Sequence, residues 1–189
     1  MDKNILACWP HEADYLKEAF TRAFTEGLKN PTKRVRMQEW IDIFNRLEND
    51  YAYCPHCGNE FLNSKVVGSG RVLICRECRQ EYRRPFCMSV RLKNSRVIRK
   101  IYLSPQIGKN PGSTLKVHDI EDAPNDDRAI GEVLENRISG KWGLRNLSDG
   151  TWRVRTANGI ENTIAPGEIL ILWDDMDIDF GTAEAKIVM

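Results

Sequence analysis

The chain of 189 residues lacks a long apolar run. Its mean hydropathy is −0.49, and no stretch approaches the roughly 18 apolar residues of a membrane-spanning helix. The opening segment MDKNILACWPHEAD has no basic start followed by an apolar block, so we expect no secretory signal peptide. These absences predict a soluble cytoplasmic protein with no membrane partner.

The sequence also lacks an excess of charge of one sign, because 28 Lys and Arg stand against 27 Asp and Glu. This balance hides an uneven distribution. Residues 1–50 carry 8 basic and 9 acidic side chains, residues 51–104 carry 11 and 3, and residues 105–189 carry 9 and 15. Three blocks of different composition predict three structural units. We expect a helical segment (1–50), a cysteine-rich segment (51–86) and a β-rich segment (87–189).

Four of the six cysteines form two CxxC pairs, Cys54-Pro-His-Cys57 and Cys75-Arg-Glu-Cys78, separated by 17 residues. Two such pairs on tight turns direct four thiolates at one metal ion, which predicts a zinc ribbon. The site has no open position for water, so we expect structural Zn²⁺ rather than catalytic Zn²⁺. Iron is the chemical alternative, because a rubredoxin-like site uses the same four thiolates.

The segment FLNSKVVGSGRVLICR, between the two pairs, predicts two strands joined by a turn at residues 68–70. Gly58 follows the first pair, where such a turn commonly needs positive φ. His56 lies inside that pair, and we expect it to be an exposed turn residue. The remaining cysteines and histidines have no partner at ligand spacing, so we expect no metal or catalytic role for Cys8, Cys87, His11 and His118.

Basic residues recur through and after the cysteine segment, as a nucleic-acid-binding surface requires. They are Arg71, Arg76, Arg79, Arg83, Arg84, Arg91, Lys93, Arg96, Arg99 and Lys100. Few aromatic residues accompany them, and a four-thiolate zinc centre carries a charge of about −2 that offsets part of the excess. We therefore favour a solvated or interdomain basic face over a nucleic-acid interface.

The first 50 residues predict two amphipathic helices. Apolar residues recur at helical spacing from Asp14 to Leu28 and again from Met37 to Leu47. The segment AFTEGLKNPTKRVRMQEWIDIFNRL resembles the last two helices of a protein-kinase catalytic domain, with matches at Pro31, Arg34, Glu39 and Trp40. The sequence lacks the Gly-rich loop, the catalytic H-R-D and the D-F-G of that family, so we expect no catalytic activity.

The last hundred residues alternate short apolar stretches with turn-forming segments, which predicts an antiparallel β-sandwich. NGI and SDGT are hairpin signals, because Asn-Gly and Asp-Gly readily supply positive φ. Trp142, Trp152 and Trp173 are expected to pack in the core or at its edge. The predicted fold class is therefore α+β with several units: a helical pair, a zinc ribbon and a sandwich.

Residues 142–181 resemble a forkhead-associated (FHA) domain, a sandwich that reads phosphothreonine. The matching residues are Ser148, Gly150, Thr151, Ile178, Phe180 and Gly181. Asp149 stands where the family has Asn, and a carboxylate there should repel a phosphate. Lys109 falls where the family has Arg, and His118 lies near the position of a family His.

The order of the three resemblances is similar to the C-terminal part of bacterial multi-domain serine/threonine protein kinases. It implies a non-catalytic regulatory module with a protein partner, phosphorylated or not, bound around Lys109, Ser148 and Asp149. The alternative is a nucleic-acid-binding zinc-ribbon protein that uses basic residues of the cysteine segment, namely Arg71, Arg76, Arg79, Arg83 and Arg84.

Overall fold

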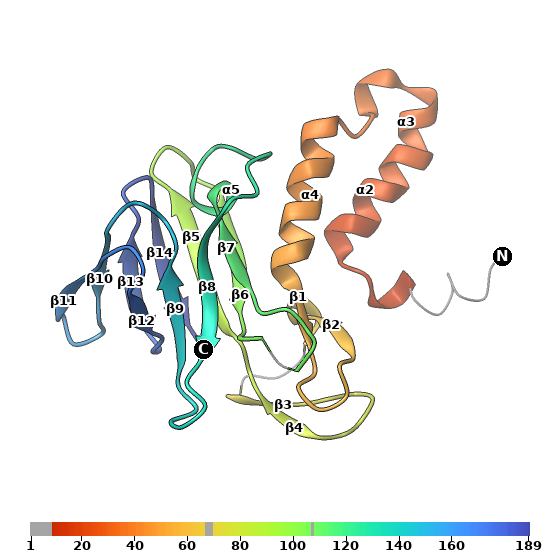
Figure 1. The fold of residues 1–189 in the computed structure, drawn as a ribbon. Coiled ribbons are helices and arrows are strands. Elements are labelled where there is room, and N and C mark those ends of the chain that lie inside the picture. The colour runs from red at the N-terminus through yellow and green to blue at the C-terminus, as the bar shows by residue number, and fades with distance from the viewer. Residues whose placement is uncertain (1–8, 67–69, 107) are drawn as a thin grey trace.

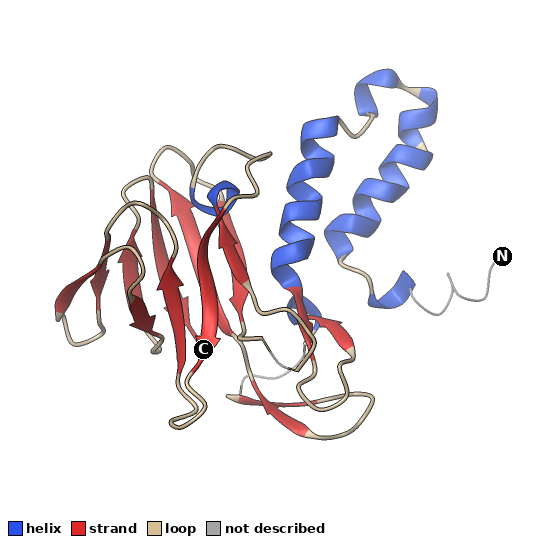
Figure 2. Cartoon of the chain, viewed as in Figure 1, coloured by secondary structure: helices blue, strands red, loops and turns tan. Residues whose placement is uncertain are grey.

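The computed structural model of the chain describes residues 9–66, 70–106 and 108–189. They form a helical unit (residues 9–50), a cysteine module (51–85) and a β-sandwich (86–189), which follow one another along the chain (Figure 1). The two longest helices lie at one side of the molecule, and a short helix lies at the end of the strands of the β-sandwich (Figure 2). This confirms the predicted mixture of helices and antiparallel sheets. Within the described residues, no helix has the length and apolar character needed to cross a membrane.

The helical unit is a hairpin of two helices that lie side by side in Figure 1. Its elements are η1 (Trp9–His11), α2 (Asp14–Phe24), α3 (Glu26–Lys29), η2 (Pro31–Lys33) and α4 (Met37–Asp50). The sequence predicted one helix as far as Leu28, but the helix breaks at Thr25, whose φ of −118° and ψ of −81° leave the helical region. The short α3 and η2 then reverse the chain.

The cysteine module consists of two small hairpins. Its elements are β1 (Tyr51–Tyr53), β2 (Glu60–Leu62), η3 (Asn63–Lys65), β3 (Val72–Ile74) and β4 (Glu81–Arg83). β1 pairs with β2 and β3 pairs with β4, so each hairpin holds one CxxC pair at its tip. The predicted pairing of strands across residues 68–70 is wrong, because each cysteine turn itself reverses the chain. Residues 68 and 69 lie outside the described residues.

The β-sandwich contains two antiparallel sheets. The first has six strands in the order β11-β10-β13-β14-β5-β6, and the second has four in the order β12-β9-β8-β7. The strands are β5 (Phe86–Leu92), β6 (Ile98–Leu103), β7 (Thr114–Lys116), β8 (Ala129–Glu135), β9 (Trp142–Asn146), β10 (Trp152–Arg155), β11 (Glu161–Ile164), β12 (Ile169–Ile171), β13 (Met176–Asp179) and β14 (Ala183–Val188).

The hydrophobic core lies between the two sheets. Strands such as β14 alternate strictly between buried and exposed side chains, as a sheet with one covered face requires. Gly131 on β8 shows how closely the sheets approach, because a Cβ there would lie 3.2 Å from Trp152 of the other sheet. Trp142 and Trp152 are buried, as predicted, whereas Trp173 is 54% exposed at the edge.

The two hairpin predictions in the β-sandwich have different outcomes. The NGI signal is confirmed, because β10 and β11 form a hairpin in which Gly159 has a φ of 75°. The SDGT segment does not form a hairpin, because β9 and β10 belong to different sheets and the segment crosses between them. At the end of β7 the chain turns into the short helix α5 (Val117–Ile120), and the Asp119 carboxylate accepts the Lys116 N–H at 2.8 Å.

Candidate metal centre and its surroundings

The two CxxC turns of the cysteine module have the same backbone geometry. In the first, Cys54 N–H donates to the Asn59 carbonyl and Gly58 N–H donates to the Cys54 carbonyl, both at 2.9 Å. In the second, Cys75 N–H donates to the Gln80 carbonyl and Arg79 N–H donates to the Cys75 carbonyl, both at 3.0 Å. Because each turn places its second cysteine back over the first, all four thiols point into the space between the hairpins.

The residue after each pair adopts a left-handed conformation. Gly58 has a φ of 72°, as predicted, and Arg79 has a φ of 60° at the matching position of the second turn. Glycine enters this region freely, whereas a residue with a Cβ does so at a cost of about 1 kcal/mol or more. The second turn therefore carries backbone strain that the first turn avoids.

The four sulfur atoms are spaced for one tetrahedral metal ion. All lie within 4.8 Å of one another. The sulfurs of Cys54 and Cys78 are 3.7 Å apart, and so are those of Cys57 and Cys75. A tetrahedron with metal–sulfur bonds of about 2.3 Å has edges of about 3.8 Å. The cluster is therefore compatible with a metal site whose four positions are all filled by thiolates.

The electrostatics of the cluster favour a bound cation. The backbone N–H of Cys78 donates to the Cys75 sulfur and lowers the pKa of that thiol to about 7, against the opposing effect of burial. The pKa of Cys78 instead rises to about 12, because burial and the three neighbouring sulfurs outweigh the N–H of Gln80 that donates to it. Four thiolates in one place need a metal ion to neutralise their repulsion.

His56 is exposed, and its ring bonds the opposite hairpin rather than facing the sulfurs. Its Nε2 lies 2.9 Å from the Glu81 carbonyl oxygen on β4. Cys87 has a half-buried position on the outward side of β5, and burial raises the pKa of its thiol. The prediction for Cys8 concerns a residue outside the described ranges.

Polar contacts join the cysteine module to the helical unit. Asp50, the last residue of α4, is buried, and its carboxylate accepts the Ser64 N–H at 2.7 Å. Its carbonyl accepts the Asn63 side-chain amide at 2.9 Å. Lys65 lies 2.6 Å from Asp14 at the start of α2. Since α4 also continues directly into β1, the cysteine module and the helical unit are joined both by the chain and by these contacts.

Other contacts join the cysteine module to the β-sandwich. The guanidinium of Arg83 lies over two rings of the sandwich, 4.5 Å from the centroid of Trp142 and 5.0 Å from that of Phe86. Its Nη1 donates to the Gly140 carbonyl at 3.3 Å. Arg71 reaches Asp174 at 3.4 Å, and the side-chain amide of Asn110 lies 3.3 Å from where a Cβ would stand at Gly58. The module therefore contacts both neighbours.

The structure does not bring the predicted partner residues together. Lys109 is exposed in the loop between β6 and β7, at the end of the β-sandwich that faces the cysteine module. Ser148 and Asp149 lie between β9 and β10 at the opposite end, beside Trp152. The strand register separates the two ends by the length of the sheet, so these residues cannot form one binding surface.

Ser148 has a structural role that the sequence did not predict. Its Oγ donates to the Asn146 side-chain oxygen at 2.7 Å and accepts the Trp152 indole N–H at 3.2 Å. Asn146 is fully buried and donates to the carbonyls of Gly150 at 2.7 Å and Ile164 at 3.0 Å. Sequence reasoning missed Asn146; an Asn at the end of a buried strand, just before the crossing segment, was the available signal.

A cluster of polar side chains connects α4 of the helical unit to α5 of the β-sandwich. Asn49 donates to Asp119 at 2.6 Å, and Asn45 donates to the Pro124 carbonyl at 2.9 Å. Burial raises the pKa of Asp119. His118 is also buried, with its Nδ1 3.3 Å from a carboxylate oxygen of Asp127, whereas His11 is exposed. These contacts fix the helix against the sandwich.

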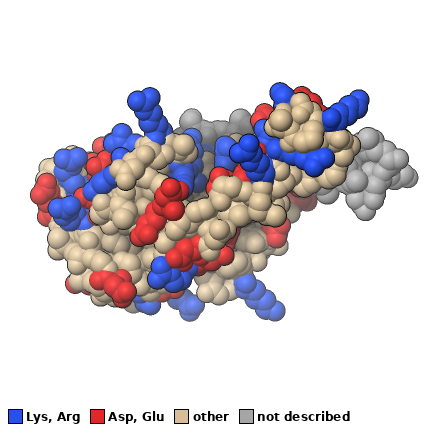
Figure 3. Space-filling view, turned by 90° about the horizontal axis from the view of Figure 1, so that it is seen from above, with Lys and Arg blue, Asp and Glu red and all other residues tan. Residues whose placement is uncertain are grey.

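Most of the basic residues named above, between Arg71 and Lys100, form ion pairs or hydrogen bonds within the molecule. Arg99 Nη1 donates to the His118 carbonyl at 2.6 Å, Arg91 pairs with Glu184 at 3.0 Å, and Lys93 pairs with Asp179 at 3.0 Å. Arg76 and Arg79 are exposed on the second cysteine turn. On the face shown in Figure 3, basic and acidic side chains are interspersed rather than gathered by sign.

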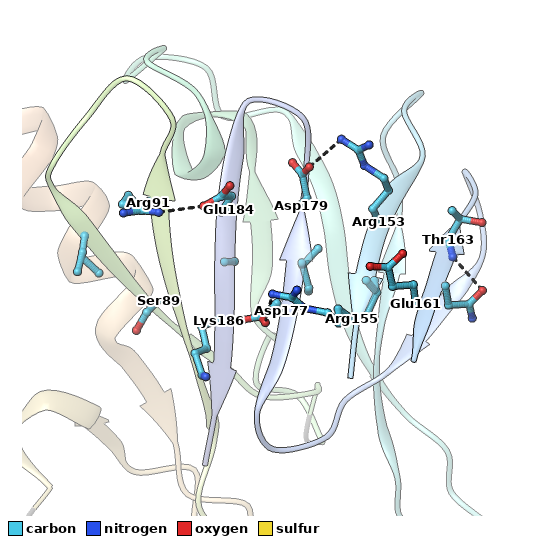
Figure 4. Close-up of a pocket in the computed structure, with 15 residues that line it drawn as sticks. Ser89, Arg91, Arg153, Arg155, Glu161, Thr163, Asp177, Asp179, Glu184 and Lys186 are labelled. Carbon is cyan, nitrogen blue, oxygen red and sulfur yellow. Dashed lines mark hydrogen bonds and ion pairs between the residues drawn. The ribbon is translucent and has the colours of Figure 1, made fainter. Parts of the chain in front are cut away.

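An open groove of about 950 Å³ follows the outer face of the six-stranded sheet (Figure 4). Its charges are arranged in cross-strand pairs. Arg153 pairs with Asp179 at 2.8 Å, and Arg155 pairs with Asp177 at 3.2 Å. Since these charges compensate one another, the groove offers no concentrated field for a charged ligand.

The comparisons with known proteins give no relative: no family model, no curated protein and no solved structure matches this chain. The kinase and FHA resemblances therefore rest on the sequence motifs.

Proposed function

We propose that this chain is a non-catalytic interaction module of serine/threonine kinase signalling, in which a structural zinc ribbon joins a helical pair to an FHA-like sandwich. The observation that carries the proposal is the four-sulfur cluster, with its 3.7 Å spacings, in a module that contacts both neighbours. Zinc fits a closed four-thiolate site, and iron is the alternative ion. A metal at this place stabilises a junction rather than performing a reaction.

The partner surface in this proposal is the end of the β-sandwich that carries Ser148 and Asp149. Asp149 is exposed there, whereas Ser148 is committed to the hydrogen bonds with Asn146 and Trp152. Loops held by a rigid scaffold are common binding sites. A protein partner docks at this end, and the Asp149 carboxylate disfavours a phosphorylated one.

Binding of matched peptides tests this proposal, with fluorescence anisotropy against phosphothreonine peptides and their unphosphorylated forms. Asp149→Asn removes one negative charge beside the ligand and should strengthen binding of a phosphothreonine peptide by about tenfold at low salt. Asp175→Asn, at the opposite end of the sandwich, is the matched control and should leave the affinity unchanged. If neither peptide form binds wild type or Asp149→Asn, the peptide-reading part of the proposal is wrong.

The second candidate is a nucleic-acid-binding ribbon, favoured by the exposure of Arg76 and Arg79 on the second cysteine turn. It ranks lower because Arg71 and Arg83 contact the β-sandwich instead of solvent alone. A titration with single- and double-stranded oligonucleotides at several salt concentrations separates the two. Nucleic-acid binding requires an affinity that falls linearly with the logarithm of the salt concentration.

A further inference from the structure

The helical unit has two unlike sides. On one side, charged contacts bridge α2 and α4: Arg22 pairs with Glu39, and the Arg46 guanidinium lies 3.8 Å from the ring centroid of Tyr15. The other side carries aromatic rings. This division follows the helical period, since residues four apart share one face.

The aromatic side forms one continuous surface. Phe20 lies 6.0 Å from Phe24 and 5.0 Å from Trp40, and Trp40 lies 5.9 Å from Phe44, measured between ring centroids. Trp9 extends the series, 6.2 Å from Phe20. Met37 precedes Trp40 by three residues and Phe44 by seven, so it lies on the same face of α4. We name these six residues the aromatic face: Trp9, Phe20, Phe24, Met37, Trp40 and Phe44.

Much of this face is open to solvent. The exposed fractions are 75% for Met37, 64% for Phe24, 51% for Phe44 and 39% for Trp9. With about 200 Å² for each such side chain, these four residues alone expose roughly 450 Å² of contiguous apolar surface. That lies within the range of about 300–600 Å² for the largest patch on a typical monomeric protein, and such patches are often functional.

The inside of the helical unit does not compensate for this exposure. The buried residues of its core cluster are Ala13, Leu16 and Leu62, and Leu62 comes from the cysteine module. Phe20 and Trp40 of the aromatic face are partly buried against this core. Trp9, Phe24, Met37 and Phe44 remain exposed beside them.

Two charged residues at the border of the aromatic face are already paired. Lys17, on the α2 side, lies 2.9 Å from Asp14, and Glu48, on the α4 side, lies 2.5 Å from Lys116. A charged partner would find no strong field of opposite sign here, whereas an identical apolar surface would meet no uncompensated charge of like sign.

We propose that the aromatic face is the interface of a homodimer, in which the helical hairpins of two copies pack across a twofold axis. A stable interface buries about 800 Å² on each partner, of which about 65% is apolar in homodimers. This requires about 520 Å² of apolar surface from each copy, close to what the face supplies. The two hairpins would then form a four-helix arrangement with the rings at its centre. The inference does not depend on the function proposed above.

Sedimentation velocity and light scattering of the full chain between about 1 and 100 μM test this inference. Wild type should be a dimer across most of this range. The double variant Phe24→Glu/Phe44→Glu should weaken dimerisation at least 30-fold and give a monomer, because each change buries a charge among rings at the centre of the interface. Both residues are more than half exposed, so the monomer should fold.

Ile138→Glu is the matched control. Ile138 is 99% exposed in the turn between β8 and β9 and should leave the dimer intact. Circular dichroism and metal content, equal in all variants, would confirm that each is folded. A wild-type monomer throughout the concentration range would overturn the inference, and so would a dimer that Phe24→Glu/Phe44→Glu leaves unchanged.

Discussion

In the β-sandwich, 23 buried apolar residues lie between two sheets, whereas the core cluster of the cysteine module comprises Cys54, Leu73, Cys75 and Tyr82. Two of those four residues are proposed metal ligands. The sandwich can therefore be stabilised by hydrophobic burial. The module, with two hairpins of three-residue strands, is too small for that and needs a cross-link or a metal ion.

The comparison extends to how each region tolerates strain. In the β-sandwich, the side chain of Asn146 makes four hydrogen bonds, which fix the segment that crosses between the sheets. The cysteine module keeps Arg79 in a left-handed conformation with a φ of 60°, and the β-sandwich keeps Asp175 there with the same φ. Asp enters this region more readily than Arg does, so the strain is greater in the cysteine module.

The largest expected effect is the loss of a ligand. Cys75→Ser should abolish metal binding and unfold residues 51–85, because structural zinc contributes on the order of 10 kcal/mol to small metal-dependent folds. The β-sandwich should keep its β-rich circular dichroism spectrum. Elemental analysis and thermal melting provide the measurement. Cys87→Ser, at a cysteine outside the cluster, should retain both metal and melting temperature.

A cavity in the β-sandwich should give the opposite pattern. Leu144 is fully buried, and Leu144→Ala should lower the free energy of unfolding by about 2–5 kcal/mol while metal content stays unchanged. Denaturant unfolding measures the change. Ile138→Ala, at a residue that is 99% exposed, should stay close to wild type. A parallel loss of metal in Leu144→Ala would show that the two regions do not differ as described.

Relief of strain in the cysteine module should be smaller. Arg79→Gly keeps the N–H that donates to the Cys75 carbonyl and removes the Cβ from a residue with a φ of 60°. We expect it to stabilise the module by about 1 kcal/mol, read as greater resistance to a chelator. Arg76→Gly removes a charge of the same sign from a residue without positive φ and should bring no such gain. Equal behaviour of the two variants would argue against backbone strain at Arg79.

The smallest expected effect concerns the ion pair between the helical unit and the cysteine module. Hydrogen bonds from Lys65 and Lys17 lower the pKa of Asp14 to about 2 from its usual value near 3.8. A lowered pKa in the folded state means that the contribution is complete above about pH 4 and is lost as the pH falls toward 2. Asp14→Asn should thus lower the melting temperature slightly at pH 7, with the difference from wild type shrinking at low pH and in high salt. A difference that persists at pH 2 would exclude the ion pair as its cause.

The sequence was informative where structure depends on local spacing. The CxxC pairs predicted the sulfur cluster, and apolar periodicity predicted α2 and α4. It failed where structure depends on distant partners. The segment with Asp149 has good hairpin chemistry, yet β9 and β10 belong to different sheets, which no local pattern reveals. For the same reason Lys109 and Ser148 were expected together, although the strand register sets them at opposite ends.

Hydrogen exchange before and after removal of the metal from the wild-type chain tests the central claim most directly. The account predicts one zinc ion per chain and, after chelation, loss of amide protection in residues 51–85 with residues 86–189 little changed. A chain purified without zinc or iron whose exchange is unaffected by chelator would contradict the claim that a metal ion holds the cysteine module together.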